Sequence, residues 1–232
     1  MSGPLLELHE VTCTIGGVRA VDGVDLAVDE GQIVGIAGPN GAGKTSLFNA
    51  ITGFIPYQVG DVRWAGRSVR GWKPHRIANS GLMRTFQNAG GFAEMTVRQN
   101  LAVSARRWDG PGIEEIADAL MLAEHMDRKV GDCSLATRKL VGLAIAAVRR
   151  PRMILLDEPL AGLDDLERDA AVNTIRLVHR GGVTVLLIEH DVDRMLALVD
   201  RLVILDLGAK VAEGTPAELA DDPALRDVYL KA

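Results

Sequence analysis

Cysteine is scarce in this sequence, since only Cys13 and Cys133 occur among 232 residues. Their neighbours lack the Cys and His spacing of a zinc site, and two cysteines do not make a disulfide framework. We therefore expect a reduced, cytoplasmic setting. An excess of basic residues is also missing, because the net charge is −5. Binding to a nucleic-acid backbone needs clustered Lys and Arg, so we expect no nucleic-acid partner.

Long apolar segments are absent as well. The longest apolar stretches, such as 183–188, are far shorter than the roughly 20 residues that a membrane-spanning helix needs. Residues 1–4 lead directly into a strand-like segment, without the basic and then apolar regions of a signal peptide. Any work at a membrane is therefore expected to go through a partner protein.

The sequence does have the composition of a globular protein, with 47% hydrophobic and 25% charged residues. Its length suits one α/β domain with a small attached subdomain. Residues 5–30 alternate apolar and polar residues between turns, which predicts antiparallel strands. Residues 88–150 carry helical spacing of apolar residues. We interpret them as a helical subdomain of a single domain 1–232, with 1–87 and 151–232 forming the core and the antiparallel part.

Strands and helices alternate elsewhere in the chain, and this order predicts a mostly parallel sheet that is covered on both faces. The predicted strands of this part are 32–37, 62–69, 82–86, 153–156, 183–188, 202–205 and 210–213. The predicted helices are 45–52, 74–80, 96–107, 113–126, 135–150, 166–179, 192–199 and 216–230.

A glycine-rich loop between a predicted strand and a predicted helix is the strongest motif. It matches G-x-x-x-x-G-K-[ST] in the context that this phosphate-binding motif requires. Small residues let successive backbone N–H groups point at phosphate oxygens, and the helix adds the positive end of its dipole. Lys44 can reach the β- and γ-phosphates, and the Thr45 hydroxyl can ligate Mg²⁺. The predicted site for ATP with Mg²⁺ contains Gly38, Pro39, Asn40, Gly41, Ala42, Gly43, Lys44, Thr45 and Ser46.

A second motif places two carboxylates at the end of a buried strand. The apolar residues 153–156 are followed by Asp157 and Glu158, and ligands bind at the carboxyl ends of strands in open α/β sheets. Asp157 would hold Mg²⁺ or one of its waters, and Glu158 could act as the general base toward the attacking water. Alone, the pattern also fits a strand that ends in solvated acids. The glycine loop upstream favours the catalytic interpretation.

Two more candidates depend on these motifs for their meaning. His190 comes soon after the predicted strand 183–188, where it could touch the γ-phosphate or orient the water, although a lone histidine there is more often structural. Gln87 follows the predicted strand 82–86, and its amide can ligate Mg²⁺ or water. A lone surface glutamine would by itself indicate nothing.

In this order the motifs resemble those of the ATP-binding subunits of ABC transporters, over essentially the whole chain. The resemblance makes 38–45 the Walker A loop, 153–158 the Walker B motif, Gln87 the Q-loop and His190 the switch histidine. The D-loop of the family matches Ala161, Gly162, Leu163 and Asp164. The resemblance implies an α/β fold, with a RecA-like P-loop NTPase core, an antiparallel β subdomain and a helical subdomain. It also implies an ATPase.

Several short strings resemble the LivG-type ATPases of branched-chain amino-acid importers more narrowly. They are 52–54, 84–87, 94–101, 214–216 and 222–230. Urea and short-amide importers share much of these strings, and lipopolysaccharide-export ATPases share less. The resemblance therefore implies an importer ATPase with branched-chain amino acids as the expected cargo, and it leaves those other two systems as alternatives.

In this family two ATPase subunits face each other head to tail, with each ATP between the Walker A loop of one and the signature loop of the other. The resemblance thus implies a second ABC ATPase subunit, with a heterodimer favoured and a homodimer possible. It also implies transmembrane permease subunits at the inner face of the cell membrane, and indirectly a solute-binding protein. Residues 88–100 would form part of the groove that receives the permease.

The sequence departs from the family pattern in two places. The signature L-S-G-G-Q falls on Cys133, Ser134, Leu135, Ala136 and Thr137, and only Ser134 matches. We expect the composite site that uses this signature, together with Asp164, to be the weaker of the two. Ile15 stands where the family usually stacks an aromatic residue on adenine, so we expect weaker base discrimination and competition by GTP.

Two other functions remain as alternatives. Soluble relatives that act in DNA repair or on ribosomes usually carry a long coiled-coil insertion or two cassettes, and this sequence has neither. A nucleotide-dependent regulator with weak hydrolysis is favoured by the altered signature. The intact Asp157, Glu158 and His190 oppose it.

Overall fold

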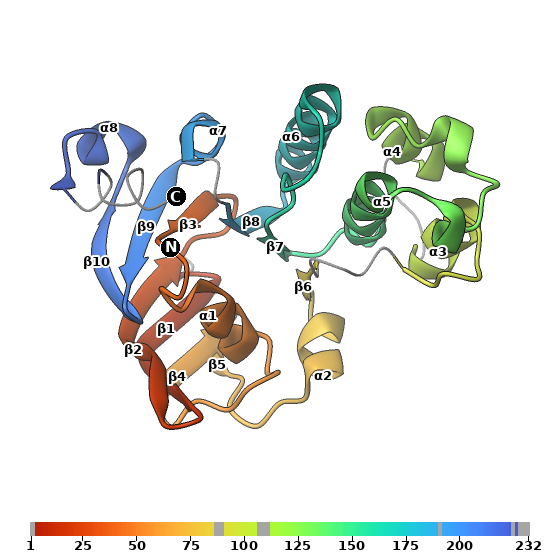
Figure 1. The fold of residues 1–232 in the computed structure, drawn as a ribbon. Coiled ribbons are helices and arrows are strands. Elements are labelled where there is room, and N and C mark those ends of the chain that lie inside the picture. The colour runs from red at the N-terminus through yellow and green to blue at the C-terminus, as the bar shows by residue number, and fades with distance from the viewer. Residues whose placement is uncertain (1–2, 86–90, 106–111, 190–191, 224–225, 227–232) are drawn as a thin grey trace.

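The computed structural model describes residues 3–85, 91–105, 112–189, 192–223 and 226 (Figure 1). Its larger sheet has six strands in the order β10-β9-β3-β8-β7-β6. All neighbouring strands in it are parallel except β9 and β10. The strands are β3 (Ile33–Ala37), β6 (Leu82–Arg84), β7 (Met153–Asp157), β8 (Thr184–Ile188), β9 (Arg201–Asp206) and β10 (Ala209–Gly214).

The smaller sheet is antiparallel, as residues 5–30 predict, and has the order β2-β1-β4-β5. Its strands are β1 (Leu6–Ile15), β2 (Val18–Val28), β4 (Val59–Trp64) and β5 (Arg67–Ser68). The prediction of one strand over 62–69 is wrong. Ala65 and Gly66 both have positive φ, as a two-residue hairpin turn of type I′ requires. They fold the segment into β4 and β5.

Helices form most of the remaining structure. They are α1 (Lys44–Ile51), α2 (Pro74–Asn79), α3 (Val97–Ser104), α4 (Ile113–Ala119), α5 (Leu135–Val148), α6 (Asp165–Arg180), α7 (Val192–Leu196) and α8 (Pro216–Leu219), with 3₁₀ turns at Ala123–His125 and Val130–Asp132. The predicted helix 113–126 is wrong in its second half. Met121 takes a φ of +57°, which an α-helix does not tolerate, so α4 stops at Ala119.

Alternate residues of the central strands enter two separate hydrophobic cores. Ile154 and Leu156 pack with residues of α3, α5 and α6, whereas Leu155 packs with residues of β1, β2 and α1. Both faces of the larger sheet are therefore covered, and the predicted α/β fold class is confirmed. In Figure 1, α3, α4 and α5 lie together beyond β6. The subdomain boundary at 87/88 lies outside the described residues.

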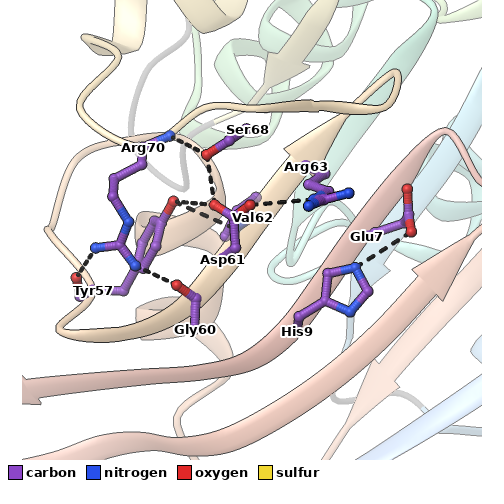
Figure 2. Close-up of polar contacts among 9 residues, drawn as sticks. All are labelled: Glu7, His9, Tyr57, Gly60, Asp61, Val62, Arg63, Ser68 and Arg70. Carbon is purple, nitrogen blue, oxygen red and sulfur yellow. Dashed lines mark hydrogen bonds and ion pairs between the residues drawn. The ribbon is translucent and has the colours of Figure 1, made fainter.

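A cluster of polar side chains connects the segment after α1 to the antiparallel sheet through hydrogen bonds (Figure 2). Ser68 donates a 2.6 Å hydrogen bond to Asp61, and Arg70 donates to the carbonyl oxygens of Tyr57 and Gly60. Burial would raise the pKa of Asp61, but the hydrogen bond from Ser68 and the charges of neighbouring arginines lower it overall. Burial raises the pKa of Tyr57. The cluster thus holds the chain that leaves the C-terminal end of α1.

Candidate functional site

The glycine loop joins β3 to α1 at the carboxyl end of the larger sheet. It passes so close to its neighbours that two of its glycines have no room for a side chain. A Cβ on Gly38 would lie 2.2 Å from the Leu205 carbonyl oxygen, and one on Gly43 would lie 2.1 Å from the Ala20 carbonyl oxygen. Gly43 also has a φ of +95°, which L-residues rarely adopt. β2 and β9 therefore fix the curl of this loop.

The N-terminus of α1 is open toward the space inside the loop. Gly43 is its N-cap and supplies no side-chain cap, and the first turn has no acidic residue. The first N–H groups of a helix lack intrahelical partners and carry the positive end of its dipole. Thr45 is exposed and Ser46 is half-buried in this turn. The predicted phosphate site thus has the donors and the sign of charge that an anion needs.

Lys44 is folded back into the loop. Its side chain is only 6% exposed, and Nζ donates hydrogen bonds to the carbonyl oxygens of Gly38 at 2.6 Å and Pro39 at 3.0 Å. Burial lowers the pKa of Lys44, while the nearby carboxylates of Glu158 and Asp157 act to raise it. The tertiary structure therefore brings Lys44 of the glycine loop close enough to Asp157 and Glu158 for their charges to interact, although the two motifs are far apart in the sequence.

β7 delivers the two carboxylates as predicted. All its residues are buried, and Asp157 is its last residue. Glu158 takes a φ of +50° and its N–H donates to the Ile188 carbonyl oxygen at 3.0 Å. A positive φ is uncommon for a glutamate and costs free energy, and such strain concentrates at functional sites. Glu158 lines the same pocket as Lys44.

Asp157 forms a buried ion pair that the motifs do not reveal. Arg84 Nη2 lies 2.6 Å from Asp157 Oδ2, and the two side chains are 5% and 2% exposed. The other carboxylate oxygen, Oδ1, is buried and has no hydrogen-bond partner among the described residues. A buried, unpaired carboxylate oxygen is costly. Its chemistry fits a hard cation such as Mg²⁺, or a water bound to one.

The described residues do not offer a complete metal site of their own. Within the described ranges, no group of three or more His, Cys, Asp or Glu residues is placed to hold a metal ion. Mg²⁺ usually keeps one or two carboxylates and completes its shell with waters and substrate phosphates. Asp157 and the Thr45 hydroxyl fit that pattern.

A pocket of about 480 Å³ opens over the glycine loop, which is the size of a small-ligand site. Its lining consists of Val18, Arg19, Ala20, Asn40, Gly41, Ala42, Gly43, Lys44, Thr45, Ser46, Glu158 and Leu207. Ile15, the predicted adenine contact, is absent from this lining. Its hairpin neighbour Val18 lines the pocket and is 69% exposed. Sequence reasoning missed Val18, Arg19 and Leu207, since no linear signal links them to the loop.

The signature segment begins α5. The Ser134 hydroxyl caps the helix by accepting from the Thr137 N–H at 3.0 Å, and it lies 2.8 Å from the Thr137 hydroxyl. Thr137 is 8% exposed, whereas Leu135 is 62% exposed. Ala136 is half-buried. The Thr137 hydroxyl is thus engaged within the helix end, and Ser134, Leu135 and Ala136 are the more accessible residues. A contact with a partner's ATP stays a prediction.

Asp164 has a local structural role. It is the N-cap of α6, and its carboxylate accepts from the Glu167 N–H at 2.8 Å. Gln87 and His190 lie outside the described residues. The last described residues before them, Thr85 and Glu189, follow β6 and β8, the two neighbours of β7 in the sheet. Because β6, β7 and β8 are parallel, Thr85 and Glu189 lie at the carboxyl end of the sheet, as Asp157 does.

Residues 21–161 match the family model that describes the ABC transporter. This chain belongs to the ATP-binding subunits of ABC transporters. The ABC ATPase is 37% identical to the high-affinity branched-chain amino acid transport ATP-binding protein BraF of Pseudomonas aeruginosa, with 99% of each chain covered. It is 32% identical to the corresponding LivG protein of Escherichia coli K12, again with 99% of each covered.

Solved structures agree with this assignment. An ATP-binding cassette of an ABC transporter in its ADP conformation superimposes with a TM-score of 0.84 at 29% identity, covering 99% of both chains. A nucleotide-free cassette gives 0.85 at 29% identity, covering 97% of this chain and 98% of the other. The ABC ATPase therefore binds nucleotide and hydrolyses ATP. None of its described helices is long and apolar enough to cross a membrane.

Proposed function

We propose that this ABC ATPase drives the import of branched-chain amino acids by coupling ATP hydrolysis to permease subunits in the cell membrane. The observation that carries the ATPase part is the buried Lys44 inside the glycine loop, which lies close to Glu158 and Asp157. The cargo is supported by the relatives BraF and LivG, which are named as branched-chain amino acid transport proteins and match along nearly their whole length.

In the proposed mechanism the ATP phosphates occupy the N-terminus of α1. Lys44 exchanges the carbonyl oxygens of Gly38 and Pro39 for phosphate oxygens, because a charge-assisted hydrogen bond to an anion is stronger. Thr45 and Asp157 would hold Mg²⁺, which neutralises charge on the β- and γ-phosphates when bound. Glu158 accepts a proton from the attacking water, and we assign Gln87 and His190 to positioning that water and the γ-phosphate.

The proposed assembly contains a second ATPase subunit and two permease subunits, and the chain lies in the cytoplasm at the inner face of the membrane. A heterodimer is favoured because the signature at 133–137 departs from the family pattern.

Reconstitution with the native permease subunits and solute-binding protein tests the proposal. We expect binding protein loaded with leucine, isoleucine or valine to stimulate ATP hydrolysis, and the Glu158→Gln subunit to abolish the stimulation. Stimulation by urea or a short amide instead would replace the cargo assignment. A subunit that binds ATP but gives no turnover in any complex would favour the regulator alternative.

A further inference from the structure

Arg84 stands at the end of β6 and holds two elements of the site together. Its Nη2 donates to Asp157 Oδ2 at 2.6 Å, and its Nη1 donates to Asn49 Oδ1 at 2.6 Å. Asn49 lies in α1, and the guanidinium also lies 5.6 Å from the centre of the Phe48 ring. One buried guanidinium therefore fixes the strand that ends in Asp157 to the helix that begins with Lys44 and Thr45.

This arrangement fixes both proposed metal ligands relative to each other. Thr45 sits in the first turn of α1, and Asp157 is tied to the last turns of the same helix through Arg84 and Asn49. The two hydrogen bonds of the Arg84 guanidinium therefore link the Asp157 carboxylate to the helix that carries Thr45. Arg84 occupies Oδ2, and Oδ1 is the oxygen without a partner in the described part of the chain.

The loop is surrounded by charges of both signs. Asp157 and Glu158 supply two negative charges, while Lys44 and Arg84 supply two positive ones. A divalent cation entering alone would meet the buried guanidinium of Arg84 beside Asp157, and this positive charge opposes its binding in a low-dielectric site. ATP brings phosphate oxygens and a large negative charge, which the cation needs. Lys44 can turn to those phosphates, whereas Arg84 is held on both sides.

We propose that Arg84 is a positioning residue that orients Asp157 for the metal and whose charge keeps the nucleotide-free site from binding a divalent cation. The cation then enters with the nucleotide. This inference rests on the proposed function, because it takes Asp157 as a metal ligand. Arg84 itself touches neither nucleotide nor metal in this role.

Mn²⁺ binding, monitored by electron paramagnetic resonance, tests separately whether the charge of Arg84 excludes the cation and whether Arg84 orients Asp157. In the nucleotide-free protein, Arg84→Gln removes the charge, and we expect the Mn²⁺ affinity to rise at least about fivefold. Arg84→Lys keeps the charge but loses the fork of donors, so its nucleotide-free affinity stays at the wild-type level. In the ADP complex, however, Arg84→Lys should bind Mn²⁺ about threefold more weakly, since Asp157 is less firmly oriented.

A double variant provides the matched control. Arg84→Gln with Asp157→Asn removes both buried charges, and its nucleotide-free Mn²⁺ affinity should return to the wild-type level. A purely structural Arg84 would lower the melting temperature of the single variants and leave every Mn²⁺ affinity unchanged, which would overturn the inference.

Removing one partner of a buried ion pair is strongly destabilising, so Arg84→Gln is checked for folding by circular dichroism. If Arg84→Gln does not fold, the Asn49→Ala variant tests the positioning role instead. This variant removes the hydrogen bond from Arg84 to Asn49 and keeps the ion pair, and a Mn²⁺ affinity of its ADP complex equal to that of the wild type would overturn the positioning role. A wild-type protein that fails to bind a fluorescent ATP analogue would instead contradict the proposed function, and the two failures are thus distinguishable.

Discussion

The ammonium of Lys44 donates a 2.6 Å hydrogen bond to the carbonyl oxygen of Gly38, the first residue of the glycine loop that Lys44 itself ends. The loop therefore satisfies its buried lysine internally. Phosphate oxygens are better acceptors for an ammonium than neutral carbonyls, so ATP binding is expected to break this contact.

Replacement of Lys44 tests that exchange. We expect Lys44→Ala to weaken ATP binding by about ten- to a hundredfold, since hydrogen bonds to charged groups contribute about 1.5–3 kcal/mol. Titration with a fluorescent ATP analogue measures the change. The exposed Lys73 gives the control Lys73→Ala, which should bind as the wild type does. Equal affinities of the two variants would contradict the role of Lys44.

Glu158 is expected to act on the attacking water rather than on binding. Glu158→Gln should keep the affinity for ATP and lower hydrolysis in the assembled complex by at least about a hundredfold, the contribution of a general base. It should also favour a closed ATPase dimer, which size-exclusion chromatography with ATP detects. The exposed Glu115 supplies the control Glu115→Gln. Unchanged turnover of the Glu158 variant would rule out this role.

The steric surroundings of the loop predict that replacing two of its glycines by alanine lowers the free energy of unfolding by different amounts. Gly41 and Gly43 both have positive φ, at +82° and +95°, but only the Cβ on Gly43 would collide with a neighbour, the Ala20 carbonyl oxygen. Gly41→Ala should cost about 1–2 kcal/mol of unfolding free energy from the backbone alone. Gly43→Ala should cost about 2–5 kcal/mol, because overpacking adds to it. Urea unfolding measures the free energy of unfolding of both variants. Equal losses would show that the loop shifts to accommodate the Cβ on Gly43 without strain.

The altered signature predicts a gain of function. Ala136→Gly with Thr137→Gln restores two family residues, and we expect turnover of the assembled complex to rise. Thr137 now bonds to Ser134 through its hydroxyl, so Thr137→Val serves as a control that removes this contact without adding the longer amide. If the turnover of the restored variant is the same as that of the wild type, the composite site that uses this signature does not limit hydrolysis.

Cys13 provides a probe of the antiparallel sheet. Burial raises the pKa of its thiol to about 11, above the value of about 8.5 for an exposed cysteine. Because the pKa is higher in the folded state, the thiol contributes to the free energy of unfolding at pH values below the pKa of an exposed cysteine. This contribution is lost as the pH rises toward 11. In a Cys133→Ala background, alkylation by iodoacetamide at pH 8 should be slow in the folded protein and fast in urea. Rapid labelling without urea would place Cys13 at the surface.

Local patterns were sufficient for the motifs and for most elements. The apolar strand before Asp157 and the glycine loop before Lys44 follow from residues adjacent in the chain, so the sequence alone predicts their conformation. Local patterns failed at two places where the backbone takes a positive φ at a residue other than glycine. Met121 ends α4 inside an apolar helical pattern, and Ala65 begins the turn between β4 and β5.

By itself, the sequence determined the α/β fold class, the order of the motifs and the phosphate-binding loop, because each depends on short-range periodicity and on glycine backbone freedom. Only the tertiary structure decided which distant groups meet. It pairs Arg84 with Asp157 across 73 residues and places Val18 and Leu207 at the rim of the loop pocket. Such contacts depend on strand order and packing, which no linear spacing encodes.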